Sequence, residues 1–317
     1  MRHLATLAFL LIASLPLAAA ELILELPGGS RRWSSTELLA HPQTRSLSIP
    51  ADPAYQRKMH YRALPLAVLL EDVHPGDHLQ ALALDGFAAE LPAAPLLRED
   101  EDGARAWLAI EDPAAPWPEL GEHKASAGPF YLVWSDPQAG DIGPEQWPFQ
   151  IARIRLLASV AERFPALLPA ADADADVQAG LALFQKHCLA CHRLNGQGDA
   201  RFGPDLNLPY NPTEYFREAF LRRYIRDPQG LRQWSQGRMP GFSAAVLAED
   251  ELDRLLAYLR HMAGRKAGSR YIRDPQGLRQ WSQGRMPGFS AAVLAEDELD
   301  RLLAYLRHMA GRKAGSR

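Results

Sequence analysis

The sequence GLALFQKHCLACHRLNGQGDARFGPDL, residues 180–206, holds both cysteines of this 317-residue chain. They occur in Cys188-Leu189-Ala190-Cys191-His192, at the end of a run with helical spacing. Two thiols one helical turn apart can bond to the two vinyl groups on one porphyrin edge, and the next residue then places an imidazole beneath the iron. The motif therefore predicts one covalently attached haem c per chain, with His192 as the proximal iron ligand.

Three other uses of a Cys-x-x-Cys pair compete with this interpretation: a dithiol redox site, half of a zinc site and a structural disulfide. Zinc needs further Cys or His ligands at suitable spacing, and the sequence has no second cysteine pair. A thioredoxin-like site belongs in a βαβ unit, whereas this pair lies in a helical region. Haem attachment is therefore the favoured interpretation.

A second axial ligand is expected from the loop Gly237-Arg238-Met239-Pro240-Gly241-Phe242. A thioether is a soft, neutral ligand that raises the haem potential and suits electron transfer. Most methionines only fill cores, but Met239 lies in a Gly/Pro loop rather than on an apolar helix face. We therefore expect Met239 to be the distal ligand, with Met286 as a duplicate candidate in a repeated segment.

Together these motifs make residues 177–264 resemble a class I cytochrome c domain. The resemblance covers the helix before the motif, Cys-x-x-Cys-His, the Gly203-Pro204-Asp205-Leu206 segment, the Met loop and a closing helix. It implies that the carbonyl of Pro204 contacts the His192 ring and fixes its tautomer. It also implies that Gly180 and Phe184 of the first helix meet Tyr258 of the last. We predict an all-α cytochrome c domain over residues 177–270.

The preceding residues, 21–165, predict a mixed α+β domain with a strand majority. Asp85-Gly86 between two apolar runs predicts a hairpin turn, and Ser34 with Glu37 resembles a capping box that opens a short helix. A second helix is expected from Pro65 to Asp72. The strand candidates are Leu22–Leu26, Arg45–Ile49, Leu79–Leu84, Phe87–Leu91, Ala106–Ile110, Phe130–Trp134 and Phe149–Leu157.

Three segments of this domain resemble the sulfite-oxidase-type molybdopterin domain: Tyr61–Leu66, Asp85–Phe87 and Gly128–Trp134. Enzymes of that family ligate molybdenum through a Cys thiolate, and both cysteines here belong to the haem motif. We therefore expect a molybdopterin-oxidoreductase-like domain without a molybdenum cofactor. Its aromatic residues are expected to be core or turn residues of the fold: Tyr61, Phe130, Tyr131 and Trp134.

Residues 166–176 are rich in Ala and contain Pro169, with Ala and Asp alternating over 171–176, and predict a linker. After the haem region, residues 224–270 recur without a change as residues 271–317, so the Met loop and the closing helix are both duplicated. The second copy has no cysteine and can add no second covalent haem. Either copy could serve the one haem, and we expect the second to be displaced.

Residues 1–20 have the pattern of a signal peptide, with Arg2 and His3 before an apolar run and small residues up to Ala20. Cleavage near Ala20 would give a periplasmic protein. No later stretch is long and apolar enough for a transmembrane segment in the mature chain. A formal charge of −3 with interspersed acids and bases shows no nucleic-acid footprint.

These observations predict a periplasmic mono-haem cytochrome that carries single electrons between redox donor and acceptor proteins. The N-terminal domain would be a docking or scaffold module. With His192 and Met239 bound, no coordination position is left for a substrate, which favours an electron-transfer protein or subunit over a stand-alone enzyme. The alternative is a fused periplasmic oxidoreductase, whose N-terminal domain oxidises a small substrate while the haem relays electrons.

Overall fold

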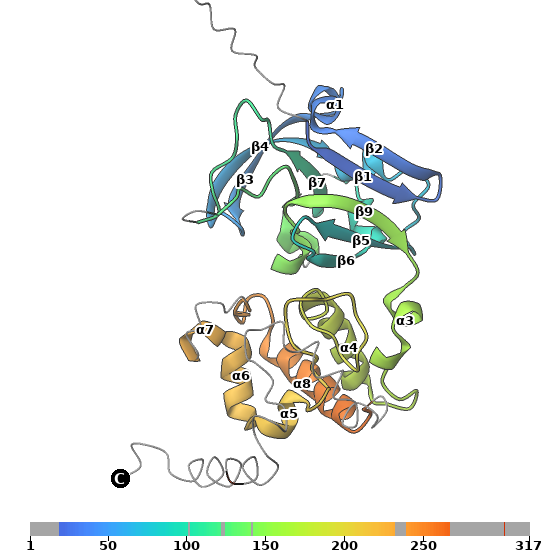
Figure 1. The fold of residues 1–317 in the computed structure, drawn as a ribbon, viewed down its shortest axis with the longest axis vertical. Coiled ribbons are helices and arrows are strands. Elements are labelled where there is room, and N and C mark those ends of the chain that lie inside the picture. The colour runs from blue at the N-terminus through green and yellow to red at the C-terminus, as the bar shows by residue number, and fades with distance from the viewer. Residues whose placement is uncertain are drawn as a thin grey trace, which may run out of the picture. The chain divides into compact units, whose positions relative to one another are not determined.

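The computed structural model describes residues 19–100, 102–121, 124–140, 142–231 and 239–266, together with Arg301. The chain divides into two compact units, Met1–Ala267 and Gly268–Arg317. The first unit contains a strand-rich region followed by a helical region (Figure 1). We call these regions the sheet domain, residues 21–157, and the helical domain, residues 175–263.

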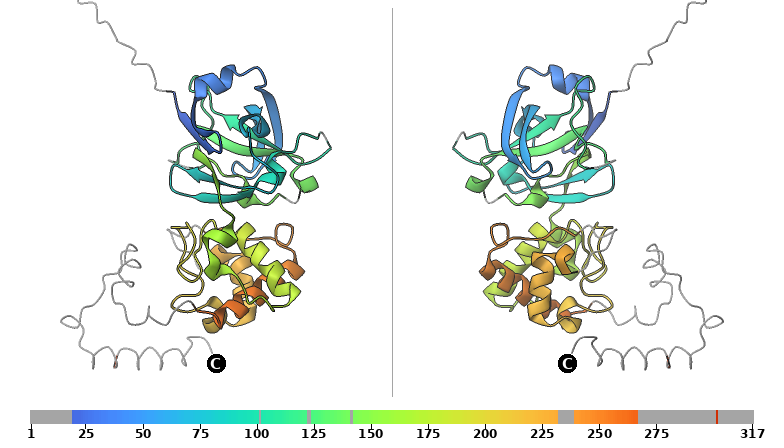
Figure 2. Two further views of the ribbon diagram at one scale, coloured as in Figure 1. Left: turned by 90° about the vertical axis from the view of Figure 1, so that its right-hand side faces the viewer. Right: turned by 90° about the vertical axis from the view of Figure 1, so that its left-hand side faces the viewer.

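The sheet domain holds a five-stranded sheet of order β2-β1-β9-β5-β6 and a four-stranded sheet of order β3-β4-β7-β8. Strand β1 runs parallel to β9, and the other pairings are antiparallel. Figure 2 shows the two sheets from two further sides. The strands are Glu21–Leu26 (β1), Gly29–Ser34 (β2), Arg45–Asp52 (β3), Arg57–Pro65 (β4), His78–Ala83 (β5), Ala88–Pro92 (β6), Arg105–Ile110 (β7), Phe130–Ser135 (β8) and Ile151–Leu157 (β9). Short helical segments connect them: Ser35–Ala40 (α1), Leu66–Leu69 (η1), Ala93–Leu96 (α2), Pro137–Gly140 (η2) and Pro144–Gln146 (η3).

The burial pattern of each strand follows its sequence. In β1, Leu22 and Leu24 are buried, whereas the other residues of the strand are at least partly exposed. One face of this strand therefore packs against the core. Consecutive apolar residues in β8 are buried from Phe130 to Trp134, so this strand is covered on both sides. These buried residues belong to one continuous core of the sheet domain.

The structure confirms the seven predicted strands, within a few residues at their ends, and the predicted hairpin. In the turn between β5 and β6, Gly86 has a φ of +91°, a conformation that glycine adopts without steric cost. The predicted capping box is also present. Ser34 accepts a hydrogen bond from the backbone N–H of Glu37, whose side chain accepts one from Ser34 in return.

Strands β2 and β4 were not predicted, and the expected helix from Pro65 to Asp72 was wrong in its extent. Strand β2 lies at a sheet edge and is largely exposed, so it carries no apolar alternation. Pro65 is still paired in β4, opposite Trp107. Only the short 3-10 segment η1 follows it, because Asp72 already has a φ of +63° in the next turn.

The helical domain contains α4 (Ala175–His187), α5 (Pro212–Tyr215), α6 (Glu218–Arg226), α7 (Pro228–Leu231) and α8 (Glu249–Ala263). It is preceded by α3 (Val160–Arg163) and η4 (Pro165–Leu167). Helices α5 and α6 are separate, because Phe216 and Arg217 between them both have extended backbone angles. The first and last predicted helices are confirmed as α4 and α8.

Helices α4 and α8 contact each other at the residues that the resemblance to cytochrome c implied. A Cβ on Gly180 would lie 2.2 Å from the carbonyl oxygen of Arg254 and 2.6 Å from Cβ of Tyr258, so only glycine fits there. The rings of Phe184 and Tyr258 lie 5.5 Å apart, and the Tyr258 hydroxyl donates to the carbonyl of Leu167 at 2.7 Å. The closing helix of the first copy of the repeat is therefore part of the core.

The second copy of the repeat lies outside the described residues except for Arg301, which is helical and exposed. The expectation that this copy is displaced therefore stays a prediction, as does the signal peptide over residues 1–20, most of which also lies outside the described range. Within the described ranges, no helix has the length and apolarity required to cross a membrane.

Candidate functional site

The Cys-x-x-Cys-His motif begins where α4 ends. Asp174 caps the start of the helix by accepting from the backbone N–H of Val177 at 2.8 Å. At the other end, the N–H groups of Cys191 and His192 both donate to the carbonyl of Cys188, at 3.0 and 2.8 Å. This turn brings the two cysteines and the histidine onto one short, helix-like segment.

The His192 ring is held by the backbone twelve residues later. Its Nδ1 lies 2.8 Å from the carbonyl oxygen of Pro204, which can only accept, so Nδ1 carries the hydrogen. The other ring nitrogen, Nε2, is then unprotonated in the neutral imidazole and can coordinate a metal. Burial lowers the pKa of His192, which favours this neutral form.

Gly203 lets the chain pass close to the His192 ring. A Cβ at this position would lie 2.4 Å from Cε1 and 2.5 Å from Nδ1 of His192. The N–H of Gly203 also donates to the carbonyl of Cys191 at 2.7 Å. Any other residue here would push the imidazole out of its position beside Pro204.

The two thiols are not bonded to each other and are not activated. Burial raises the pKa of Cys188, and it raises the pKa of Cys191 to about 11, with a further contribution from Glu145 in both cases. A catalytic dithiol instead needs a thiolate at neutral pH, which means a lowered pKa. In the described part of the chain, no group of three or more His, Cys, Asp or Glu residues could hold a metal ion. The raised pKa values of both thiols therefore disfavour the dithiol interpretation.

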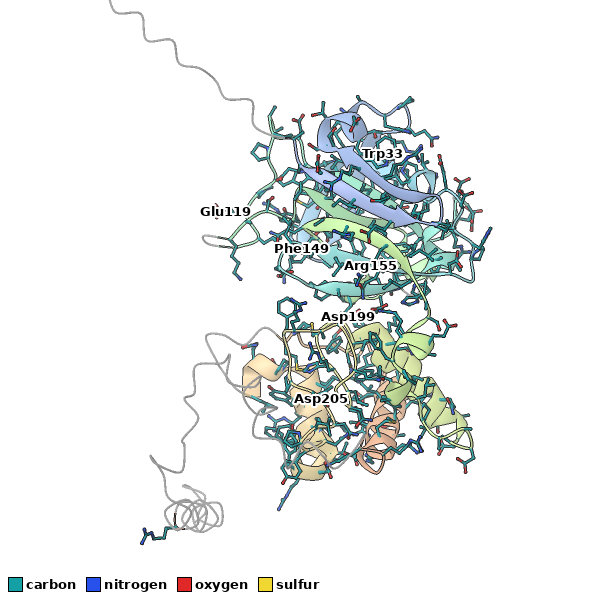
Figure 3. All side chains as sticks on the ribbon, turned by 45° about the vertical axis from the view of Figure 1, so that its right-hand side comes forward. Trp33, Glu119, Phe149, Arg155, Asp199 and Asp205 are labelled. Carbon is teal, nitrogen blue, oxygen red and sulfur yellow. The ribbon has the colours of Figure 1, made fainter. Side chains whose placement is uncertain are left out.

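The loop after the motif is held by side chains that the sequence analysis did not single out. Asp205 is labelled in Figure 3. Its carboxylate accepts from the backbone N–H groups of Asn195, Gly196, Asn207 and Leu208 at distances of 2.6 to 3.2 Å. Such a cap fixes the residues next to Pro204, because it satisfies several backbone donors with one side chain. The Asp after Gly203-Pro204 was part of the recognised segment, but its capping role was not foreseen.

Two buried asparagines join this loop to α8. Asn207 donates to the carbonyl of Met262 at 2.7 Å, and Asn211 donates to the carbonyl of Leu259 at 2.9 Å. Asn211 also donates to the side chain of Asn207 at 2.9 Å. Buried asparagines need several hydrogen-bond partners. The only sequence signal for their role in joining the loop to α8 was their spacing in a Pro-rich loop.

Met239 is partly buried against the helical core. The loop after it is fixed to α6, because the N–H of Phe242 donates to the carbonyl of Ile225 at 3.1 Å and Arg226 donates to the carbonyl of Phe242 at 2.9 Å. Residues 232–238 of the loop and the duplicate candidate Met286 lie outside the described residues. Met262, in contrast, is buried on α8.

A buried polar cluster in the sheet domain surrounds Asp52, and its carboxylate is hydrogen-bonded to protein groups. The Asp52 carboxylate accepts from the hydroxyls of Tyr61 and Tyr131 at 2.8 and 3.2 Å, and from the N–H groups of Ala54 and Tyr55. Burial, together with the nearby Asp52 carboxylate, raises the pKa of both tyrosines and keeps them neutral. Phe130 and Trp134 are also buried, so these four aromatic residues pack in the core.

Three other histidines have hydrogen-bond partners within the protein. His261 accepts at Nε2 from the backbone N–H of Ala170 at 3.0 Å. His78 is hydrogen-bonded to Glu90 at 2.5 Å, and Nδ1 of His187 lies 3.2 Å from Glu145. His123 lies outside the described residues.

The donor set fits a covalently held haem. Two unpaired, protonated thiols lie one turn apart, and thiols in this state are the groups that can form thioethers with vinyl carbons. The neutral imidazole that follows them presents one ring nitrogen while the other is fixed. Met239, which lies in a loop of this domain, is the further soft ligand expected from the sequence.

Comparisons with known proteins give a match to a family model and weak structural likenesses. Residues 177–263 match the family model of cytochrome c. The crystal structure of the sulfane dehydrogenase SoxCD from Paracoccus pantotrophus aligns at 17% identity and a TM-score of 0.29, over 45% of this chain and 40% of that chain. A likeness at this level supports no inference about activity. No curated protein matches the chain.

The family match and the helical architecture coincide over α4 to α8. The strand-rich sheets precede this region, so the chain has a mixed α+β part and an all-α part, as the sequence predicted. The helical part of the chain, residues 177–263, is a cytochrome c domain.

Proposed function

We propose that this chain is an exported c-type cytochrome that carries single electrons on one haem c. Cys188 and Cys191 would hold the haem covalently, with His192 and Met239 as its axial ligands. The observation that carries the proposal is the 2.8 Å contact between Nδ1 of His192 and the Pro204 carbonyl, because it orients the other ring nitrogen for a metal.

When bound, the haem supplies one-electron chemistry between ferric and ferrous iron. The task of the protein is to keep the ligands in place during that change. Pro204 keeps His192 in one tautomer and makes it a better donor, while Asp205 and the two asparagines fix the loop that carries Pro204. If Met239 also ligated the iron, no coordination position would remain for a substrate.

For the sheet domain we propose a docking or scaffold role toward redox donor and acceptor proteins. Its buried polar cluster around Asp52 is already satisfied by protein groups, which is typical of a structural core rather than of a cofactor site. The proposed organisation is a signal peptide cleaved near Ala20, a sheet-rich domain over residues 21–165, a linker at 166–176, a cytochrome c domain at 177–270 and the duplicated segment 271–317.

Voltammetry of the matured protein tests the proposal. The wild type should give one reversible one-electron wave, and Met239→Ala should lower the reduction potential, because a thioether ligand favours ferrous iron. Met286→Ala is the matched control from the identical second copy and should leave the potential unchanged. A lowered potential in Met286→Ala with no effect of Met239→Ala would assign the ligand to the second copy. No wave in the wild type would contradict the electron-carrier function.

A further inference from the structure

One contact joins the sheet domain to the residue just before the haem-attachment motif. The carboxylate of Glu145, in η3, lies 3.2 Å from Nδ1 of His187 at the end of α4. The side chain of His187 is 1% exposed and that of Glu145 is 10% exposed, so this pair is shielded from water. A Cβ on Gly143 would lie 3.3 Å from Cε1 of His187, which shows how closely this turn packs on the imidazole.

The His187 ring also contacts the segment that follows Met239. Its ring lies edge-on to the ring of Phe242, with centroids 5.6 Å apart and an interplanar angle of 73°. Phe242 is 5% exposed, and its backbone is hydrogen-bonded to Ile225 and Arg226 of α6. The His187 ring therefore contacts both the sheet domain, through Glu145, and the segment that follows Met239, through Phe242.

Within the described part of the chain, Nε2 of His187 is buried and has no hydrogen-bond partner. The Glu145 carboxylate is thus the group that sets the orientation of this imidazole. A buried polar side chain with one hydrogen bond turns or leaves its site when that bond is lost, because the remaining contacts are only van der Waals contacts. The edge-on contact with Phe242 depends on the same orientation.

A second set of contacts keeps the sheet domain at this position. Arg163 donates to Glu90 of β6 at 2.5 Å and to Asp199 at 2.9 Å, and Gln80 of β5 donates to the same two carboxylates at 2.6 and 2.7 Å. Asp199 lies in the loop between His192 and Pro204 and is labelled in Figure 3. The sheet domain is therefore connected to the loop after His192 through Asp199 and to the end of α4 through His187, which in turn contacts Phe242.

We propose that Glu145 and His187 are positioning residues through which the sheet domain holds the Met239 loop in its ligating conformation. This inference rests on the proposed function, because it assumes that Met239 is the distal haem ligand. Glu145 fixes the His187 ring, and the ring supports Phe242, which is three residues after Met239. The scaffold role of the sheet domain would then include stabilisation of the iron–thioether bond.

Binding of free imidazole to the ferric protein tests this inference, since imidazole must displace Met239. In Glu145→Ala the imidazole affinity should rise about tenfold, which corresponds to one buried hydrogen bond to a charged group. The long-wavelength charge-transfer band of thioether-ligated ferric haem should weaken in parallel. Glu145→Gln keeps an acceptor oxygen and should give an intermediate affinity. Glu71→Gln removes an exposed carboxylate of the sheet domain and should behave like the wild type.

Met239→Ala separates failure of the inference from failure of the proposed function. If Met239→Ala binds imidazole more tightly than the wild type while both Glu145 variants bind it equally to the wild type, Met239 is a ligand and the inference is wrong. If Met239→Ala also equals the wild type, the proposed distal ligand is wrong and the inference is lost with it. Covalent haem content and thermal melting of each variant identify any that fail to fold, and Glu145→Gln then decides alone.

Discussion

The polar cluster around Asp52 in the sheet domain and the haem-motif residues of the helical domain differ in whether protein groups satisfy them. In the sheet domain, the carboxylate of Asp52 is 1% exposed and is matched by two hydroxyls and two backbone N–H groups of the protein. In the helical domain, the thiols of Cys188 and Cys191 are unpaired, and His192 has one ring nitrogen fixed while the other is left for a ligand. The first arrangement is complete as it stands, whereas the second is organised around a group that is not protein.

This difference separates a structural core from a cofactor site more clearly than burial does. The Asp52 cluster is buried and the haem-motif cluster is partly buried, and burial shifts pKa values in both, raising those of Tyr61, Tyr131 and Cys191 and lowering that of His192. Only the helical cluster keeps atoms that can bond to something else. The predictions below ask whether the two clusters respond independently to substitution.

The largest expected effect is the loss of covalent haem in the double variant Cys188→Ala, Cys191→Ala. Without either thiol no thioether can form, so all haem should dissociate under denaturing conditions. Haem staining after denaturing electrophoresis measures this directly. The sheet domain should keep its own unfolding transition, because its core cluster contains no residue of the motif. Covalent haem in this variant would contradict the assignment of the motif.

Asp52→Ala should destabilise the sheet domain and leave the haem site unchanged. It leaves buried donors of Tyr61 and Tyr131 without an acceptor, which we expect to destabilise the sheet domain by about 3 kcal/mol. Urea unfolding followed by tryptophan fluorescence measures the loss, with exposed Asp100→Ala as the control. The haem spectrum should not change. A changed haem spectrum in Asp52→Ala would mean that the two clusters are coupled.

Gly180→Ala should destabilise the helical domain by about 2 kcal/mol, because the added methyl group overlaps the backbone of α8 and forces the helices apart. The matched control is Gly76→Ala in the sheet domain, where an added Cβ would meet nothing within 4 Å. Thermal unfolding monitored at the haem Soret band reports the helical domain. Equal midpoints for the two variants would show that α4 and α8 do not pack as described.

These cases show how much the sequence could predict. The haem motif and the loop methionine could be proposed from local spacing, whereas the contact of Gly180 with Tyr258 was implied by the resemblance to cytochrome c and is confirmed. The five-residue motif needs no knowledge of distant segments. The strand candidates were also correct wherever apolar residues form runs or alternate, as in Phe130–Trp134.

Other features depend on partners far along the chain and left no local signal. Strand β2 is polar and exposed, so its pairing with β1 becomes visible only in the folded sheet. Asn207 and Asn211 are satisfied by carbonyls of α8, about fifty residues later. The contact of Glu145 with His187 likewise joins residues 42 positions apart. A single sequence gives no reason to pair them.

The smallest expected effect concerns acid stability. Burial raises the pKa of Glu90, but hydrogen bonds from His78 and Arg163 lower it more, and its net pKa lies below the ordinary value. A carboxylate with a lowered folded-state pKa contributes stability above its unfolded pKa of about 4.3, and this stability is lost as the pH falls through the folded value. Glu90→Gln should therefore flatten the dependence of unfolding free energy on pH below about pH 5.

The control for this experiment is Glu71→Gln, whose carboxylate is exposed on the sheet domain. Denaturant unfolding between pH 3 and pH 7 compares the two variants with the wild type. A parallel pH dependence in Glu90→Gln and the wild type would show that the Glu90 network does not stabilise the folded chain.

The central claim is that the chain holds one haem, in the helical domain, and no second redox cofactor. The most direct test is the molar content of iron and molybdenum per chain after maturation in a periplasm that attaches haem. The account predicts one iron and no molybdenum. Stoichiometric molybdenum would instead favour the fused oxidoreductase, and the absence of iron would contradict the roles given to Cys188, Cys191 and His192.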